Sequence, residues 1–187
     1  MNLDRTLRVR LSVFVGAALF LLTLPLSARE LMSREQALAT ALGKEAMVER
    51  NNAFLTGTQV TAAEKRCSCE IETELVPRYT ATKAGKLLGW AYFDAHRVRT
   101  LPEILMIVVK PDGAVASVEI LSFQEPMDYF PSERWLAQFS GRKLDEELSL
   151  RGGIRPISGA TLTGRAITGA VRKILAIHAA IESGVDH

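Results

Sequence analysis

The sequence predicts an α+β domain with a mainly antiparallel sheet and a long C-terminal helix packed on it. Residues 103–110 form a continuous run of β-forming side chains, and a Pro-Asp-Gly turn separates them from a second run at 115–123. Two such runs around a short turn are typical of a β-hairpin. Helical patterns stand before and after the strands, at 33–42 and 162–183. Strands grouped between helices favour an antiparallel sheet over alternating β–α–β units.

Shorter patterns indicate the other elements. A capping box that begins at Ser33 starts the first helix. Residues 67–81 alternate enough to predict a strand, and 87–93 predict its hairpin partner. The stretch 48–63 has too weak a pattern to place. The run at 103–110 is apolar on both faces, so we expect that strand inside the sheet rather than at its edge.

Two helices follow the predicted hairpin. Ser132 begins a short one that carries Trp135 and Phe139 on one face, and Gly141 ends it. In the last helix, apolar residues recur at spacings of three and four, which indicates an amphipathic helix packed on the sheet. His178 interrupts that apolar stripe, and we interpret it as a partly buried packing residue.

Composition and charge indicate a folded globular domain and argue against a nucleic-acid-binding protein. The chain has 187 residues, of which 48% are hydrophobic and 24% charged, so it can form one folded core. Residues 1–28 hold three arginines and one aspartate, so the rest of the chain has 20 basic and 20 acidic side chains and no net charge. We therefore expect no nucleic-acid partner.

The first 28 residues have the layout of a targeting segment. Three arginines precede an uncharged run at 11–28 that ends in Leu-Ser-Ala. This order is typical of a secretory signal peptide. A run of about 18 apolar residues is also nearly long enough to stay as a membrane anchor. Both readings predict export, to the periplasm or to the periplasmic side of the inner membrane.

The segment 155–163, directly before the last helix, contains the candidate ligand-binding residues. Hydroxyl side chains and a glycine gather where the first backbone N–H groups of a long helix lack partners. Such a terminus attracts phosphate. The helix dipole contributes only about 0.3–1 kcal/mol, so a nucleotide needs a further attachment, which an ester to a hydroxyl would provide. The same residues would also suit an ordinary helix cap.

The sequence Ser-Gly-Ala-Thr-Leu-Thr at 158–163 resembles the flavinylation motif of the FMN-binding domain family. That family includes the C subunit of the sodium-pumping NADH:quinone oxidoreductase and the G subunit of Rnf-type complexes. The resemblance implies that FMN is esterified through its phosphate to Thr161 by a flavin transferase acting outside the cytoplasm. It also implies that the cofactor-binding residues are Thr161, Ser158, Gly159, Ala160, Thr163, Glu125 and Arg165.

Two further stretches support this resemblance, which covers roughly residues 85–178. Phe-Gln-Glu-Pro at 123–126 is similar to the family's His-x-Glu-Thr-Pro, and residues 135–142 resemble its Gln-Phe-x-Gly-Lys region. The family usually has Asp three residues before the motif, and this chain has Arg155. Its Gly-Leu-Gly is Met-Asp-Tyr here, so the expected aromatic face for stacking is Tyr129 or Phe130.

The resemblance divides the chain and assigns it a role. We expect a signal or anchor at 1–28, an N-terminal helix and first strands at 29–84, and an FMN-binding domain at 85–187. The expected function is an exported electron carrier, rather than a free-standing catalyst, that serves membrane or periplasmic electron-transfer proteins. The alternative is an exported binding or assembly module that keeps the fold without flavin, and Arg155 favours it.

Two further groups of side chains are candidates for redox or metal chemistry. Cys67 and Cys69 would share one strand face about 6.6 Å apart, near the upper limit for a disulfide, so we favour a buried strand face over a bridge. Two thiolates are too few for a closed zinc site. Asp94 and His96 would share a face, as an acid–base or metal group or as a solvated strand end.

Arginine side chains are the remaining candidates for contact with the flavin. Arg97, Arg99 and Arg165 are expected neighbours of the phosphate or the ring system, because guanidinium groups match phosphate oxygens.

Overall fold

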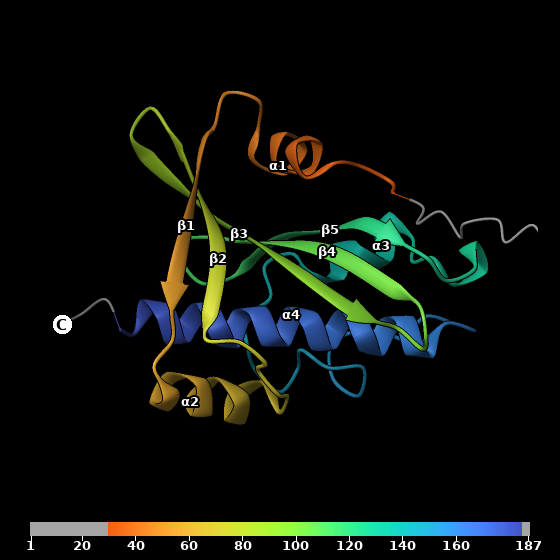
Figure 1. Cartoon of the computed structure of the whole chain (residues 1–187). Helices are drawn as coiled ribbons and strands as arrows, with labels where there is room; N and C mark the ends of the chain where they lie inside the picture. The colour runs from red at the N-terminus through yellow and green to blue at the C-terminus, as the bar shows by residue number, and fades with distance from the viewer. Residues whose placement is uncertain (1–29, 185–187) are drawn as a thin grey trace, which may run out of the picture.

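The computed structural model describes residues 30–184, so the predicted signal or anchor lies outside the described residues. The fold is α+β, as the sequence predicted. Its centre is a five-stranded antiparallel sheet in which each strand pairs with the next along the chain (Figure 1). The strands are β1 (Met47–Phe54), β2 (Leu75–Lys83), β3 (Lys86–Arg97), β4 (Pro102–Val109) and β5 (Val115–Phe123).

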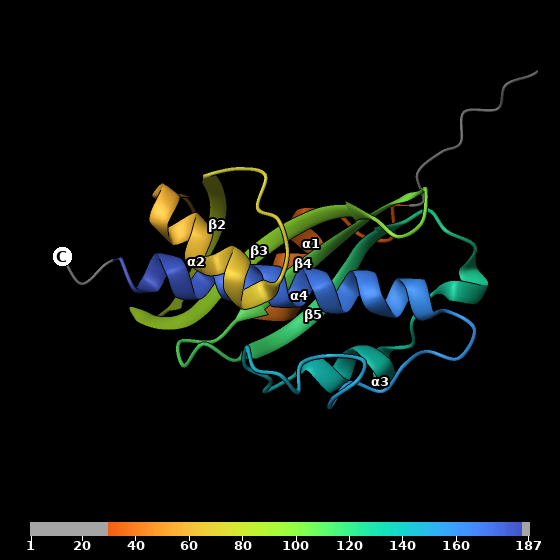
Figure 2. The same ribbon diagram turned by 90° about the horizontal axis from the view of Figure 1, so that it is seen from below.

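Helices cover both faces of the sheet. On one face lies α1 (Arg34–Leu42), and on the other lie α4 (Thr161–Glu182) and α2 (Gly57–Cys67), as Figures 1 and 2 show. A short helix, α3 (Glu133–Leu136), continues into a 3-10 turn, η2 (Ala137–Phe139), beside β5. Another 3-10 turn, η1 (Met127–Tyr129), follows β5.

The hydrophobic core is largest between the sheet and α4. Side chains from all the elements on that face pack together, with Tyr92, Phe123 and Phe139 almost fully buried. The smaller cluster beneath α1 is centred on Ala37 and Met106. Burial of this apolar surface, at about 25 cal/mol per Å², holds α4 against the sheet, and α4 in turn fixes the position of its N-terminal end.

Several predicted elements are confirmed. Ser33 caps α1 with a complete capping box, the hairpin at 103–123 is formed by β4 and β5, and the long helix runs over 161–182. The strand β4 lies inside the sheet, between β3 and β5. Among residues 30–184, none of the helices has both the length and the apolar content that crossing a membrane requires.

The predicted strand at 67–81 is wrong over its first half. Residues 57–67 form α2 behind a capping box made by Thr56 and Gln59, and the strand begins only at Leu75. The apparent alternation of Cys67 and Cys69 comes from the end of this helix, where the two sulfurs form a disulfide. The preference for two free thiols on one strand face is therefore also wrong. A left-handed Ser68 between them brings their Cα atoms to 5.2 Å, closer than in an extended strand.

Candidate functional site

The predicted attachment segment forms a tight turn that leads into α4. Gly159 has a φ of +78°, a left-handed conformation that glycine adopts without steric cost. A Cβ placed there would meet no atom within 4 Å, so the backbone conformation rather than space calls for glycine. The N–H of Ala160 donates to the carbonyl of Ile157 at 3.2 Å and closes the turn. Thr161 is then the first residue of the helix.

The N-terminus of α4 leaves backbone donors available to a ligand. Ala160 occupies the cap position and provides no side-chain hydrogen bond, and the N–H of Gly164 makes the first helical bond, to the carbonyl of Ala160. The N–H groups of residues 161–163 precede that bond and have no partner within the helix. They lie at the positive end of a 22-residue helix, an arrangement that suits a phosphate group.

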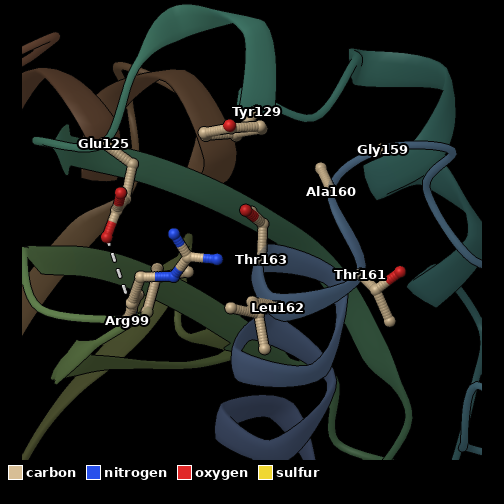
Figure 3. Close-up of a pocket in the computed structure, with 9 residues that line it drawn as sticks. Arg99, Glu125, Tyr129, Gly159, Ala160, Thr161, Leu162 and Thr163 are labelled. Atoms are coloured by element: carbon tan, nitrogen blue, oxygen red, sulfur yellow. Dashed lines mark hydrogen bonds between the residues drawn. The ribbon is translucent and has the colours of Figure 1, made fainter.

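A pocket of about 200 Å³ opens beside this terminus (Figure 3). The turn between β3 and β4, the segment after β5 and the start of α4 all contribute to its wall. The lining residues are Val98, Arg99, Glu125, Tyr129, Gly159, Ala160, Thr161, Leu162 and Thr163. Ligand sites that enclose a drug-sized molecule measure about 300–1,000 Å³, so this pocket encloses only part of a flavin nucleotide.

Glu125 links the segment after β5 to the turn between β3 and β4. Its Oε1 accepts hydrogen bonds from the backbone N–H groups of Arg99, at 3.3 Å, and Leu101, at 3.4 Å. In Figure 3 the guanidinium of Arg99 lies between Glu125 and Thr163. None of the ion pairs within residues 30–184 involves Arg99. Its charge is therefore available to an anionic ligand.

The two threonines of the motif differ in exposure and direction. Thr163 is only 1% exposed and points toward Tyr129, whereas Thr161 is exposed and its hydroxyl points away from Tyr129 and Glu125 (Figure 3). Thr161 can therefore be reached from solvent by a modifying enzyme. A group attached to its oxygen would start outside the pocket and next to the free N–H groups of α4.

Five of the seven predicted cofactor-binding residues line the pocket, namely Gly159, Ala160, Thr161, Thr163 and Glu125. Ser158 and Arg165 are exposed and lie outside its lining. Of the three arginines expected near the flavin, Arg99 lines the pocket. Arg97 instead donates to the carbonyl of Thr100. The sequence carries no signal for Val98 and Leu162, because an apolar residue in a turn or in the first turn of a helix has no distinctive chemistry.

The short helix α3 and the 3-10 turn η2 hold the segment in front of the motif. The indole Nε1 of Trp135 donates to the carbonyl of Arg155 at 2.6 Å, and the N–H of Arg155 donates to Oε1 of Gln138 at 2.9 Å. Trp135 packs edge-to-face on Phe139, with ring centroids 5.3 Å apart. Both backbone groups of Arg155 are thus fixed by side chains, while its own side chain is exposed.

A buried charge cluster lies on the strands that end at the pocket. His96 bonds through Nδ1 to Asp94 at 2.8 Å and through Nε2 to Glu103 at 2.9 Å, and Lys173 of α4 pairs with Asp94. Asp94 and Glu103 are 5% and 0% exposed, so the prediction that Asp94 and His96 share a face is confirmed and the solvated strand end is wrong. Oε1 of Glu103 is buried without a hydrogen-bond partner.

Burial and hydrogen bonds within this cluster shift the pKa values of its members. Burial alone would lower the pKa of His96, but hydrogen bonds to Asp94 and Glu103 raise it to about 9. Burial also favours the neutral form of Asp94, yet the bonds to His96 and Lys173 hold its pKa below the usual range. For Glu103, burial prevails and raises the pKa. His96 is therefore a cation at neutral pH, held between two acidic side chains.

The fold and the site together suit a ligand that carries a phosphate group. An anion-binding helix terminus, an exposed hydroxyl and an adjoining pocket are brought together at one end of α4. Residues 103–176 match the model of the FMN-binding domain. This part of the chain is therefore similar to the FMN-binding domain family, and the match indicates FMN as the cofactor. The comparisons with curated proteins and with solved structures gave no match.

Proposed function

We propose that this protein is an exported electron-transfer flavoprotein in which FMN is linked through its phosphate to Thr161. The observation that carries the proposal is the position of the Thr161 hydroxyl, which is exposed at the first residue of α4, beside backbone N–H groups without helical partners. Those N–H groups would bind the phosphate oxygens, and the guanidinium of Arg99 would provide a positive charge within the adjoining pocket. A flavin transferase outside the cytoplasm would form the ester bond.

The remaining pocket residues would orient the flavin. Tyr129 offers an aromatic face, 40% exposed, and Leu162 an apolar one, 41% exposed. Glu125 would keep the β3–β4 turn in place through its bonds to Arg99 and Leu101. Bound FMN supplies one- and two-electron chemistry, and the protein supplies its binding and orientation. Because the pocket encloses only part of a flavin, the rest would be open to a redox partner.

This arrangement favours a carrier over a free-standing enzyme. A tethered flavin meets only those donors and acceptors that dock beside it, so its partners would be membrane or periplasmic electron-transfer proteins. The run at 11–28 supports export, by cleavage or as an anchor.

In-gel fluorescence of the denatured protein tests the attachment. The full chain is produced together with a flavin transferase, and we expect flavin fluorescence to stay with the protein band. The Thr161→Ala variant should lose the fluorescence, and Thr163→Ala, which removes the neighbouring hydroxyl of the motif, should keep it. Fluorescence that persists in Thr161→Ala would contradict the proposal.

A second candidate is an exported binding or assembly module without flavin. Arg155 favours it, because a cation stands where the family usually has Asp and its side chain is exposed to a modifying enzyme. This candidate predicts an unmodified Thr161 peptide even when the transferase is present.

A further inference from the structure

The disulfide between Cys67 and Cys69 lies apart from the flavin site. Cys67 is the last residue of α2, and the bridge joins it to the irregular segment that leads to β2. Arg172 of α4 reaches this region, because its Nη2 donates to the carbonyl of Arg66 at 3.2 Å. At 1.5 Å rise per residue, Arg172 lies roughly 16 Å along α4 from Thr161.

The bridge is poorly suited to holding the fold together. A disulfide stabilises mainly by closing a loop in the unfolded chain, and the effect shrinks with the size of the loop. Here only Ser68 stands between the two cysteines. The helix end is also capped without the bridge, since the N–H of Ser68 donates to the carbonyl of Glu64 at 2.8 Å.

Other contacts already position α2. Nε2 of Gln59 donates to the carbonyl of Ala180 at 2.8 Å, and the contact of Arg172 with Arg66 secures the other end of the helix. Ala63 is fully buried between them. The helix is thus attached to α4 at its start, middle and end, so cleavage of the disulfide should leave it in place.

The two sulfurs differ in access. Cys67 is 5% exposed within the hydrophobic core, whereas Cys69, which packs at the edge of the same core, is half-buried and follows the exposed Ser68. Residues 69–74 form no helix or strand in the described structure, and hydrogen bonds from the N–H groups of Cys69, at 3.4 Å, and Ile71, at 3.0 Å, to Glu64 hold this side of the bridge to α2. An incoming thiolate would therefore attack Cys69, with Cys67 as the leaving group.

We propose that Cys67 and Cys69 form a redox-active disulfide that exchanges with a dithiol reductant. One thiolate of the reductant attacks Sγ of Cys69, the bond to Cys67 breaks, and Cys67 leaves as a thiolate that takes a proton from water. The second thiolate of the reductant then attacks its own sulfur in the mixed disulfide and releases Cys69, which is protonated in turn. The reductant loses two electrons and becomes a disulfide, and the protein gains two thiols.

A thiol titration tests this proposal independently of the flavin. The full chain, purified without flavin, is equilibrated with graded ratios of reduced to oxidised dithiothreitol, quenched with acid and alkylated with a maleimide reagent. We expect a reversible two-electron transition in the absence of denaturant. The reduced protein should keep its circular dichroism spectrum, with Tm lower by at most about 3–6 °C. A bridge that is reduced only in denaturant, or reduction that unfolds the chain, would overturn the proposal.

Two single variants test which of the two sulfurs is attacked. In Cys67→Ser the free thiol is the more accessible Cys69, and in Cys69→Ser it is the buried Cys67. We expect Cys69 to react with a disulfide reagent at least ten times faster than Cys67 under native conditions. Equal rates, or a faster reaction at Cys67, would overturn the assignment of Cys69 as the attacked sulfur. Urea should bring the two rates together, which shows that burial causes the difference.

Discussion

The indole nitrogen of Trp135 donates a 2.6 Å hydrogen bond to the backbone carbonyl of Arg155, twenty residues further along the chain. The N–H of the same Arg155 is bound by Gln138, so one short helical segment holds both backbone groups of a residue just ahead of the motif. The turn that carries Thr161 is therefore positioned by α3 and η2 as well as by α4.

Replacement of Trp135 by Phe tests this dependence. The variant keeps most of the buried aromatic surface but leaves the carbonyl of Arg155 without its donor. We expect the free energy of unfolding to fall by about 1–3 kcal/mol and flavin attachment to become slower. Urea denaturation and the time course of flavin incorporation measure the two effects. The control is Trp90→Phe, at an equally buried indole remote from the turn, which should alter stability without slowing attachment.

Gly159 should tolerate no side chain. In Gly159→Ala the left-handed φ of +78° is retained only at a cost of about 1–2 kcal/mol, or the turn changes shape and misplaces Thr161. The matched control is Gly169→Ala, in the exposed interior of α4, where alanine should stabilise by about 0.5–1 kcal/mol. Thermal unfolding of both variants checks the opposite signs. Equal stabilisation by the two substitutions would show that the left-handed turn is not required.

Stability should depend on pH through His96. Its pKa rises from the ordinary 6.5 to about 9 on folding, because hydrogen bonds to Asp94 and Glu103 outweigh burial. The stabilisation from the protonated ring is complete below about pH 6.5 and is lost as the pH rises toward 9. Glu103, with its raised pKa, acts in the same direction. We expect the free energy of unfolding to fall by at most about 1.4 kcal/mol per pH unit for one proton.

Urea denaturation at pH steps from 6 to 9.5 measures this decline. The His96→Gln variant lacks the titrating ring, so its stability should be lower at pH 6 and should change less with pH. A variant as steeply dependent on pH as the parent protein would show that another group is responsible.

Arg155 offers a test of recognition by the transferase. The Arg155→Asp variant places an acidic side chain where the FMN-binding domain family usually has one, so flavin incorporation should be faster than in the parent chain. The control is Arg151→Asp, which makes the same charge change at another exposed arginine ahead of the motif. Incorporation that rises equally in both variants would indicate a general charge effect rather than recognition of position 155.

Patterns within a few residues predicted much of the fold. The capping box at Ser33, the hairpin around residues 111–113 and the apolar stripe of α4 are local signals, and each forms as expected. The cysteines show the limit of this approach. Spacing by two suggests a strand, but Thr56 and Gln59 begin a helix whose end brings the sulfurs together.

The part of the site that is formed by one continuous stretch of sequence could be predicted. Thr161 and its neighbours form the expected turn at the N-terminus of α4. Arg99 reaches the same pocket only because β3 and β4 meet in a turn there, and its contact with Glu125 spans 26 residues. The charge cluster around His96 likewise draws on three elements, because Glu103 of β4 bonds to His96 and Lys173 of α4 pairs with Asp94, and no sequence signal links either residue to the cluster.

The mass of the peptide that contains Thr161 tests the central proposal most directly. The full chain is produced with a flavin transferase, digested, and analysed by tandem mass spectrometry. We predict a peptide heavier by the mass of FMN less one water, with the added mass located on Thr161 and absent in Thr161→Ala. An unmodified peptide from protein exposed to an active transferase, or the same mass on another residue, would contradict it.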